Sequence, residues 1–149
     1  MKDYPGKFIS ILYRKSQIYW AQILKEHDIT CAEYPVLIIL QKNDGITQEY
    51  ISSVLNIDKS AVARVIQSLL DKGFIEKKKD EEDKRCNRIY LTEKGHSTKN
   101  PIDKGRREWN SILTKNIPEE KIEEVLEILS QMAENISEYP VRAEESRGF

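Results

Sequence analysis

The sequence predicts a mainly α-helical fold that carries one small β-hairpin. Over most of the 149 residues, apolar side chains recur at the three- and four-residue spacing of amphipathic helices. Two short runs of strand-forming residues, 74–79 and 88–91, flank a segment that is too polar to pack in a core. No internal repeat, low-complexity stretch or long linker divides the chain, so a single domain of ordinary size is expected.

Two helices are expected before the turn signal Asn43-Asp44-Gly45. The first is expected over residues 5–27, where these apolar residues lie at helical spacing: Phe8, Ile11, Leu12, Tyr19 and Ile23. Thr30 and Glu33 then have the spacing of a capping box, in which each side chain accepts a hydrogen bond from the other residue's amide. A second helix is therefore expected from Thr30 to about Lys42.

A short third helix and a longer fourth helix are expected to be joined by a tight connection. Thr47 is the expected N-cap of a helix over residues 48–55, and Asp58 is the expected N-cap of a helix that ends near Lys72. Gly73 then supplies the left-handed residue that commonly follows a helix. The buried stripe of the fourth helix is expected to consist of Val62, Ile66, Leu69 and Leu70.

Two further helices are expected after the hairpin. Thr92 is the expected N-cap of a fifth helix, which has to bend or break near Pro101 because proline lacks the amide of the helical ladder. Pro118 suits the first turn of a sixth helix. The apolar residues of that helix have the alternating three- and four-residue spacing of a helix–helix seam: Ile122, Val125, Leu129, Met132 and Ile136.

Two helices joined by a tight turn and followed by a hairpin make up a winged helix-turn-helix. The second of the two helices can enter the major groove of double-stranded DNA. Its buried stripe leaves five small or polar residues facing outward as candidate DNA-binding residues: Lys59, Ser60, Ala63, Arg64 and Gln67. Small side chains permit close approach to the bases, Arg64 can pair with guanine or a phosphate, and Gln67 can pair with adenine.

The hairpin would supply a second DNA contact, outside the major groove. Its candidate DNA-binding residues are the positively charged Lys84, Arg85 and Arg88. Because an aspartate two residues before an arginine can hold that arginine across a hairpin, we interpret Asp83 as the brace of the wing. Arg85 is then the group that reaches the minor groove.

Two segments resemble the recognition helix and the wing of the MarR (multiple antibiotic resistance regulator) family of bacterial transcription factors: IDKSAVARVIQSLLDKGFI and DEEDKRCNRIYLTEKG. The family's D-x-R followed by L-T-x-x-G is matched by Asp83, Arg85, Leu91, Thr92 and Gly95. The resemblance covers essentially the whole chain. It implies one domain over residues 1–149, with a winged helix-turn-helix lobe at about 30–95 and dimerisation helices at 1–29 and 96–149.

The resemblance also implies a homodimer that binds a palindromic operator, most often as a repressor. The expected dimer-interface residues are Ile11, Leu12, Ile122, Val125, Leu129, Met132 and Ile136. Many members of the family are released from DNA by small aromatic effectors bound between the lobe and the dimerisation helices, for which the candidate pocket residues here are Tyr13, Trp20, Tyr34 and Trp109. Aromatic residues at helical spacing are also typical of a core or a dimer interface, so both interpretations stay open.

Two alternatives accompany DNA binding. A winged-helix module that binds protein instead of DNA is consistent with the acidic hairpin and the formal net charge of -1. A redox-sensing regulator is the other, because some members of the family sense oxidants through a cysteine near the start of the first helix. This chain has no cysteine there, and its thiols are Cys31, at a helix start, and Cys86, in the wing.

Enzymatic function has little support, because the sequence shows no nucleophile–base pair and no glycine-rich phosphate loop. The two cysteines lack metal-binding spacing, so neither a metal nor another cofactor is expected. The N-terminus has no apolar signal core, and the longest apolar run is too short to span a bilayer. We therefore expect a cytoplasmic protein with no membrane partner. Its acidic residues gather at the C-terminal end, where residues 117–149 hold nine Glu and three Lys or Arg.

Overall fold

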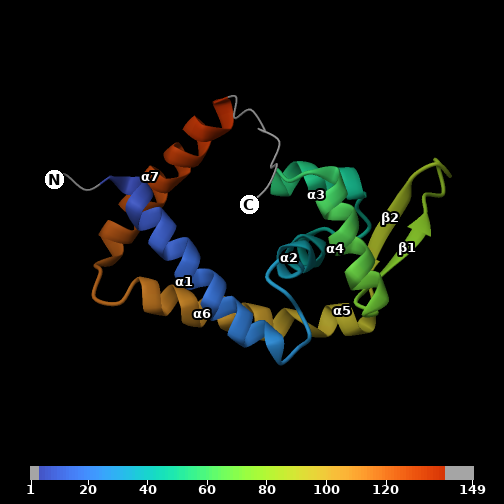
Figure 1. Cartoon of the computed structure of the whole chain (residues 1–149), viewed down its shortest axis with the longest axis horizontal. Coiled ribbons are helices and arrows are strands. Elements are labelled where there is room, and N and C mark those ends of the chain that lie inside the picture. The colour runs from blue at the N-terminus through green and yellow to red at the C-terminus, as the bar shows by residue number, and fades with distance from the viewer. Residues whose placement is uncertain (1–3, 140–149) are drawn as a thin grey trace, which may run out of the picture. The chain divides into compact units, whose positions relative to one another are not determined.

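A computed structural model of the chain describes residues 4–139 and divides into two compact units, Met1–Trp109 and Asn110–Phe149 (Figure 1). The described helices are α1 (Pro5–Lys25), α2 (Tyr34–Lys42), α3 (Gln48–Leu55), α4 (Lys59–Asp71), α5 (Glu93–Ser97), α6 (Lys99–Leu113) and α7 (Glu119–Glu138). The strands are β1 (Ile75–Lys79) and β2 (Asn87–Leu91). The predicted fold class, mainly α with one β-hairpin, is confirmed.

The capping box forms before α2, but the regular helix starts later than expected. The Thr30 amide donates to Glu33 Oε2 at 2.9 Å, and the Glu33 amide donates to Thr30 Oγ1 at 3.2 Å. Between the box and the helix lies a turn over residues 31–33. Pro35 has no amide to donate to the Cys31 carbonyl, so the helical ladder becomes continuous only from Tyr34.

The helix-turn-helix follows the predicted boundaries closely. Thr47 Oγ1 accepts a hydrogen bond from the Tyr50 amide at 3.2 Å and so caps α3 as expected. Asn56 adopts the left-handed conformation in the tight connection to α4. Asp58 is the N-cap residue of α4, but its carboxylate accepts from the Ser60 hydroxyl instead of a helix amide. The expected stripe of α4 is buried except for Leu70, which is half-buried.

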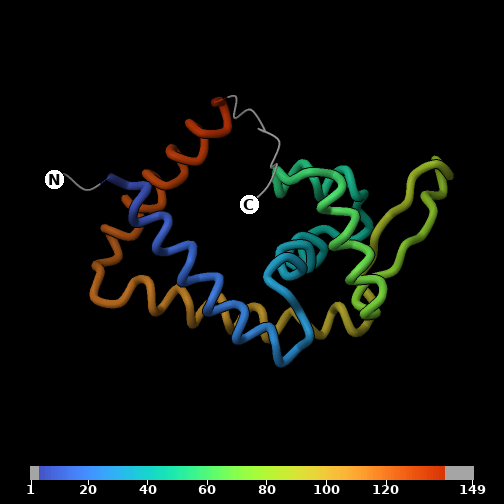
Figure 2. Tube along the Cα trace, viewed as in Figure 1, coloured from blue at the N-terminus to red at the C-terminus, as the bar shows by residue number. Residues whose placement is uncertain are grey.

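β1 and β2 pair as an antiparallel hairpin that projects from the helical part of its unit (Figure 2). The register places Ile75 opposite Leu91 and Lys79 opposite Asn87. One contact was not predicted: Ile46, just before α3, forms an isolated antiparallel bridge with Ile89. The wing is therefore joined to the chain segment that leads into the helix-turn-helix.

A single apolar core joins α1, α2, α3, α4, the hairpin and α6 within the first unit. Its buried residues are Trp20, Leu24, Ile29, Val36, Leu37, Leu40, Ile51, Val62, Ile66, Leu69, Phe74, Ile75, Ile89, Leu91 and Ile102. Each large side chain buried in this way stabilises the fold by about 1.5–3 kcal/mol before entropy is subtracted. The inner face of α4 thus holds the helix against the core, and its outer face stays exposed.

The fifth predicted helix is broken, as expected, but at Thr98 and not at Pro101. Thr92 Oγ1 accepts from the Gly95 amide at 3.1 Å and caps α5. Pro101 lies in the first turn of α6. A proline cannot donate to the carbonyl four residues earlier and its ring crowds that carbonyl, so the break falls in the turn before it. Among residues 4–139, every helix is too short or too polar to cross a membrane.

The second unit contains α7, which begins directly after Pro118 as predicted. The helix buries none of its residues in the single chain. Of the predicted seam, Ile122 and Met132 are half-buried, whereas Val125, Leu129 and Ile136 are 48%, 45% and 59% exposed. On α1, Ile11 and Leu12 are exposed as well. The dimer interface stays a prediction, for which these uncovered apolar side chains supply the surface.

Candidate nucleic-acid interface

The outer face of α4 carries the five residues that the sequence singles out. Lys59, Ser60, Ala63, Arg64 and Gln67 are all exposed, opposite the buried stripe of the same helix. The helix period alone produces this arrangement, because residues three and four apart share a face. The result is a helix surface that is short, polar and free of large apolar side chains.

The polar residues on this face differ in the hydrogen bonds and ion pairs that they make with the rest of the chain. Gln67 Nε2 donates to Asp71 Oδ1 at 2.8 Å along the helix. Lys59 Nζ lies 3.5 Å from Glu49 Oε1, and both side chains are exposed, so the pair contributes about 0–1 kcal/mol and separates easily. Arg64 has no hydrogen bond or ion pair to any residue within 4–139. Its guanidinium is thus the most available group of the face.

At the tip of the wing, Asp83 braces the main chain and not the arginine side chain. Asp83 Oδ1 accepts from the Arg85 amide at 3.0 Å, and the Asp83 carbonyl accepts from the Cys86 amide at 3.0 Å. This is an Asx-type turn, which the spacing of two residues favours. The expected carboxylate–guanidinium brace is absent, and the Arg85 guanidinium makes no ion pair within the described residues. Lys84 beside it is likewise exposed.

Arg88 is not the free cation that the sequence suggests. Its Nε donates to Asp80 Oδ2 at 2.8 Å and its Nη1 donates to the Gly45 carbonyl at 2.7 Å. The Glu82 amide and the Arg88 guanidinium both stabilise the Asp80 carboxylate and hold its pKa below the ordinary value. The carboxylates of Asp80 and Asp83 therefore hold the wing loop in its conformation. This structural role explains why two acidic residues stand in a hairpin that is expected to approach DNA.

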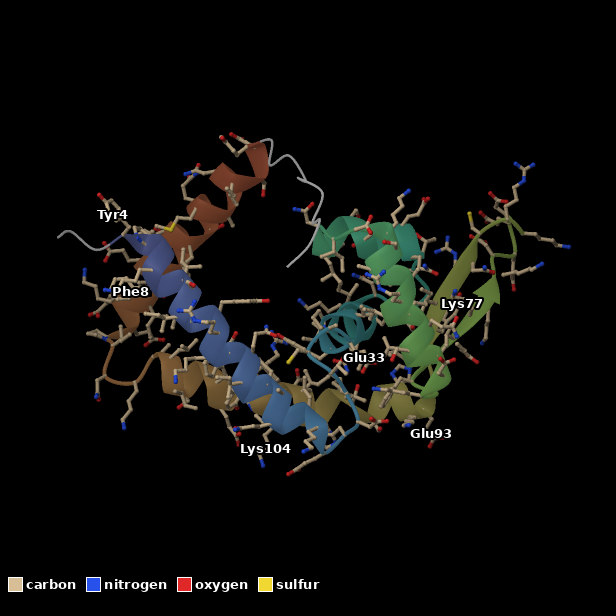
Figure 3. All side chains as sticks on the ribbon, in the orientation of Figure 1. Tyr4, Phe8, Glu33, Lys77, Glu93 and Lys104 are labelled. Atoms are coloured by element: carbon tan, nitrogen blue, oxygen red, sulfur yellow. The ribbon has the colours of Figure 1, made fainter. Side chains whose placement is uncertain are left out.

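Sequence reasoning missed a buried polar network that connects α4 to the turn before α2. Glu33 lies beside α4 (Figure 3) and is only 2% exposed. Its carboxylate accepts from the Ser68 hydroxyl at 2.5 Å and from Lys72 Nζ at 3.0 Å, while Lys72 Nζ also donates to the Asp28 carbonyl at 2.9 Å. The capping-box spacing identifies only the bond from Thr30. The partners Ser68, on α4, and Lys72, directly after it, lie 35 and 39 residues away and have no local signal.

Burial and hydrogen bonding act on Glu33 in opposite directions. Burial alone would raise the pKa of its carboxyl group, because the charged form loses solvent. The hydrogen bonds from Ser68, the Thr30 amide and Lys72 outweigh burial, so the pKa lies below the ordinary value. Glu33 is therefore a charged anchor in the native protein.

The aromatic residues proposed for an effector pocket mostly pack against one another. Trp20 is buried and stacks on Tyr34, with ring centroids 4.8 Å apart. Tyr19 joins Trp20 to Trp109, with centroid distances of 5.5 and 4.9 Å. Tyr13 is 64% exposed and stands outside these ring contacts. A surface hollow of about 330 Å³ between α1 and α6 is lined by other residues. Trp20 and Tyr34 thus belong to the core or pack against it, and Trp109 is half-buried against Tyr19. The effector pocket stays a prediction.

Neither thiol has the environment of a reactive cysteine. Burial raises the pKa of Cys31, whose Sγ lies 3.6 Å from the Gln17 carbonyl. The negative charge of Asp83 raises the pKa of the exposed Cys86. Since the thiolate is the reactive form, both shifts lower reactivity at neutral pH. Within residues 4–139, no three His, Cys, Asp or Glu side chains are grouped to hold a metal ion.

The fold, the exposed face of α4 and the hairpin define a winged helix-turn-helix protein. The MarR family model matches residues 29–87. A solved MarR transcriptional regulator from Methanosarcina mazei Go1 is 39% identical, covers 90% of this chain and 96% of its own, and has a TM-score of 0.82. The HTH-type transcriptional regulator YybA of Bacillus subtilis is 28% identical over 112 residues, 75% of each protein. The chain belongs to the MarR family of helix-turn-helix transcriptional regulators.

One of the structural relatives was solved with DNA. It is a MarR family transcriptional regulator from Listeria monocytogenes complexed with a 26mer, which is 27% identical to this chain. The match covers 91% of this chain and 90% of that one, with a TM-score of 0.84. The likeness therefore extends beyond the winged lobe to most of both chains.

Proposed function

We propose that this chain is a sequence-specific DNA-binding regulator that acts as a homodimeric repressor on a palindromic operator. The observation that carries the proposal is that two exposed arginines, one on each of the two proposed DNA-contacting elements, make no ion pair with any described residue. Arg64 lies on the exposed face of α4 and Arg85 at the tip of the wing, and neither has an ionic partner within residues 4–139. Two uncompensated guanidinium groups on a winged helix-turn-helix suit a polyanion with two grooves.

In this proposal α4 is the recognition helix and lies in the major groove. Ala63 and Ser60 leave room for the helix to approach the base edges, and Arg64 can donate two parallel hydrogen bonds to guanine. Lys59 gives up its weak pair with Glu49 for a phosphate. Gln67 has to break its hydrogen bond to Asp71 before it can bind a base. Binding through Gln67 therefore costs more free energy than binding through Arg64.

The wing would carry Arg85 into the neighbouring minor groove, with Lys84 toward a phosphate. Arginine is favoured in a narrow minor groove because the negative potential there is enhanced. The Asx turn at Asp83 fixes the main chain of Arg85 and leaves its guanidinium free to reach outward. Lys77, exposed on β1 (Figure 3), lies on the same hairpin and adds positive charge to it.

The proposed domain organisation assigns residues 30–95 to the DNA-binding lobe and 1–29 and 96–149 to dimerisation. Its support is the surface of α7, whose apolar seam is uncovered in the single chain. A dimer would bring two recognition helices to two half-sites, and repression follows where the operator overlaps a promoter. Release by a small aromatic effector is tested separately, by titrating phenolic compounds against the protein–DNA complex.

Selection of bound duplexes from a random pool, followed by sequencing, tests the proposal directly. The expected result is an enriched palindrome with half-sites about one helical turn apart. Affinity for that sequence should fall steeply with added salt, because phosphate contacts release counterions. No enriched sequence at low salt would favour the alternative of a winged-helix module that binds protein, for which the net charge of -1 is the motivation.

A further inference from the structure

Arg88 connects the wing loop to the segment that leads into the helix-turn-helix. Its guanidinium donates on one side to Asp80 Oδ2 and on the other to the Gly45 carbonyl, at 2.8 and 2.7 Å. Asp80 begins the loop that carries Arg85, whereas Gly45 lies two residues before Thr47, the N-cap of α3. The Arg88 side chain therefore joins the wing loop to a carbonyl 43 residues before Arg88 in the chain.

The backbone of Gly45 is held in place by its surroundings. Its φ angle is +74°, and a β-carbon added there would lie 2.7 Å from the ring of Tyr90. Its amide donates to the Ile89 carbonyl at 2.9 Å, and the Ile89 amide donates to the Ile46 carbonyl at 2.8 Å. These bonds form an isolated antiparallel bridge beside the two-stranded sheet, so the inner half of β2 is held on both edges.

The outer half of the hairpin has no such support. Four of the five residues of β1 are exposed, and beyond Ile89 the ladder consists of only two strands. An isolated two-stranded hairpin is at best marginally stable in water. The position of its tip therefore depends on side-chain contacts that reach back to the body of the lobe.

The Arg88 contacts extend as far as the residue proposed to enter the minor groove. The carboxylate that accepts from Arg88 also accepts from the Glu82 amide at 3.0 Å, and the Asp80 amide donates to the Cys86 carbonyl at 2.9 Å. Together these bonds close the loop of residues 80–86, within which Asp83 holds the amide of Arg85. A continuous set of hydrogen bonds thus runs from Gly45 through Arg88 to the wing tip.

We infer that Arg88 is a positioning residue for DNA binding: by clamping Asp80 to the Gly45 carbonyl, it fixes where the wing presents Arg85 relative to α4. The inference rests on the proposed function and goes beyond it, because it gives Arg88 a role without contact to DNA. The rival interpretation is that Arg88 itself binds a phosphate. The two interpretations differ in how Arg88 and Arg85 combine.

A double-mutant cycle on the selected operator separates the two interpretations. We expect Arg85→Ala and Arg88→Ala each to weaken binding about tenfold, which is the size of one lost arginine contact. If Arg88 acts through Arg85, the double variant binds no more weakly than Arg85→Ala alone. Lys84→Ala is the matched control: it removes one positive charge from the same wing and leaves the clamp intact, so its effect should multiply with that of Arg85→Ala.

Two further measurements exclude a merely structural or electrostatic effect. Arg88→Lys keeps the charge but cannot span both partners with a rigid fork, so it should bind nearly as weakly as Arg88→Ala. Hydroxyl-radical footprints of the Arg88 variants should lose protection at the wing contact and keep it at the α4 contact. The midpoint of thermal unfolding should change little, since the core contains none of the clamp residues.

The outcomes distinguish the inference from the function on which it rests. Effects of Arg85→Ala and Arg88→Ala that multiply, or full affinity in Arg88→Lys, would overturn the positioning role and leave DNA binding standing. A wild-type protein that enriches no DNA sequence would overturn both.

Discussion

In the proposed function, Arg64 is the residue on which base recognition chiefly depends. It is exposed on α4 and engaged with no other residue within 4–139. We expect Arg64→Ala to cost about 1–3 kcal/mol of binding free energy and to relax the sequence preference at one position of each half-site. Repeating the duplex selection with the variant measures both. Arg107→Ala, an exposed arginine on α6, is the control and should leave the preference intact; an unchanged preference in Arg64→Ala would contradict the assignment.

Glu33 should make the stability of the lobe depend on pH. Because its native pKa is lowered, its contribution is complete above the ordinary pKa of 4.5 and is lost as the pH falls through the native value. Glu33→Gln keeps the shape but removes the charge that pairs with Lys72. We expect a loss of about 1–3 kcal/mol in the free energy of unfolding at pH 7.

Urea unfolding of wild type and variant at pH 7 and below pH 4 tests this dependence. The difference between the two proteins should shrink on acidification, because protonation removes the same charge from the wild type. Glu123→Gln on α7 removes an exposed carboxylate and should change little at either pH. A difference that stays constant with pH would show that the Glu33 charge does not contribute.

The sequence predicts the outer face of α4 well and the wing contacts poorly, for a physical reason. A helix face follows from a period of 3.6 residues, which any local segment displays. The partners of Arg88 depend on the hairpin register and on a loop 43 residues away. Asp83 does hold Arg85, as predicted, but it accepts from the Arg85 amide and not from the guanidinium. Turn geometry decides between these two donors, and residue spacing alone does not specify that geometry.

At the scale of elements, the contact between α5 and the hairpin depends on Gly95, the last residue of the L-T-x-x-G pattern. A β-carbon there would lie 2.1 Å from the Phe74 carbonyl oxygen and 2.9 Å from Leu91 Cδ2. Gly95→Ala has to push α5 away from the strand, which we expect to cost about 2 kcal/mol or more. Thermal unfolding measures the effect.

Gly6→Ala is the matched control for Gly95→Ala. Gly6 also lies in a helix, but a β-carbon there would meet nothing within 4 Å. Since alanine is the better helix former, the control should be neutral or slightly stabilising. Equal stability of the two variants would mean that α5 can move away from Phe74 without loss of folding free energy. The close approach would then not explain why a glycine stands at position 95.

Element boundaries were predictable where local chemistry decides them. Thr47 and Thr92 cap their helices as predicted, because a hydroxyl and an amide three residues on need no distant partner. The start of α2 and the break before α6 differ from the prediction by a few residues, since Pro35 and Pro101 act on the carbonyls four residues before them. The bridge of Ile46 to Ile89 was missed because pairing across the lobe leaves no local pattern.

At the scale of the whole molecule, the apolar seam of α7 is the surface that we propose to bind a second copy of the chain. Nineteen large hydrophobic side chains of the described chain are exposed, and five of them lie between Val125 and Ile136. An uncovered apolar stripe of this length is typical of a surface that binds a partner, which is consistent with the proposed homodimer. The seam was predictable from its spacing, whereas the surface that covers it cannot be read from the order of residues in one chain.

Leu129→Lys tests whether this seam forms the proposed homodimer. Leu129 is 45% exposed in the single chain, and a lysine would place a charge in the middle of the seam that a dimer has to desolvate. We expect sedimentation at micromolar concentration to shift from dimer to monomer. Affinity for the palindromic operator should drop toward that of a single half-site, because the two lobes are no longer linked.

Gln131→Lys provides the matched control for this test, since it introduces the same charge two residues away on an exposed polar position of α7. It should remain dimeric and bind the palindrome with full affinity. A dimer that survives Leu129→Lys would place the interface elsewhere on the chain. Loss of operator affinity without loss of the dimer would mean that α7 affects the spacing of the two recognition helices and not their association. Only the joint loss of dimer and palindrome binding supports a seam that sets the half-site geometry.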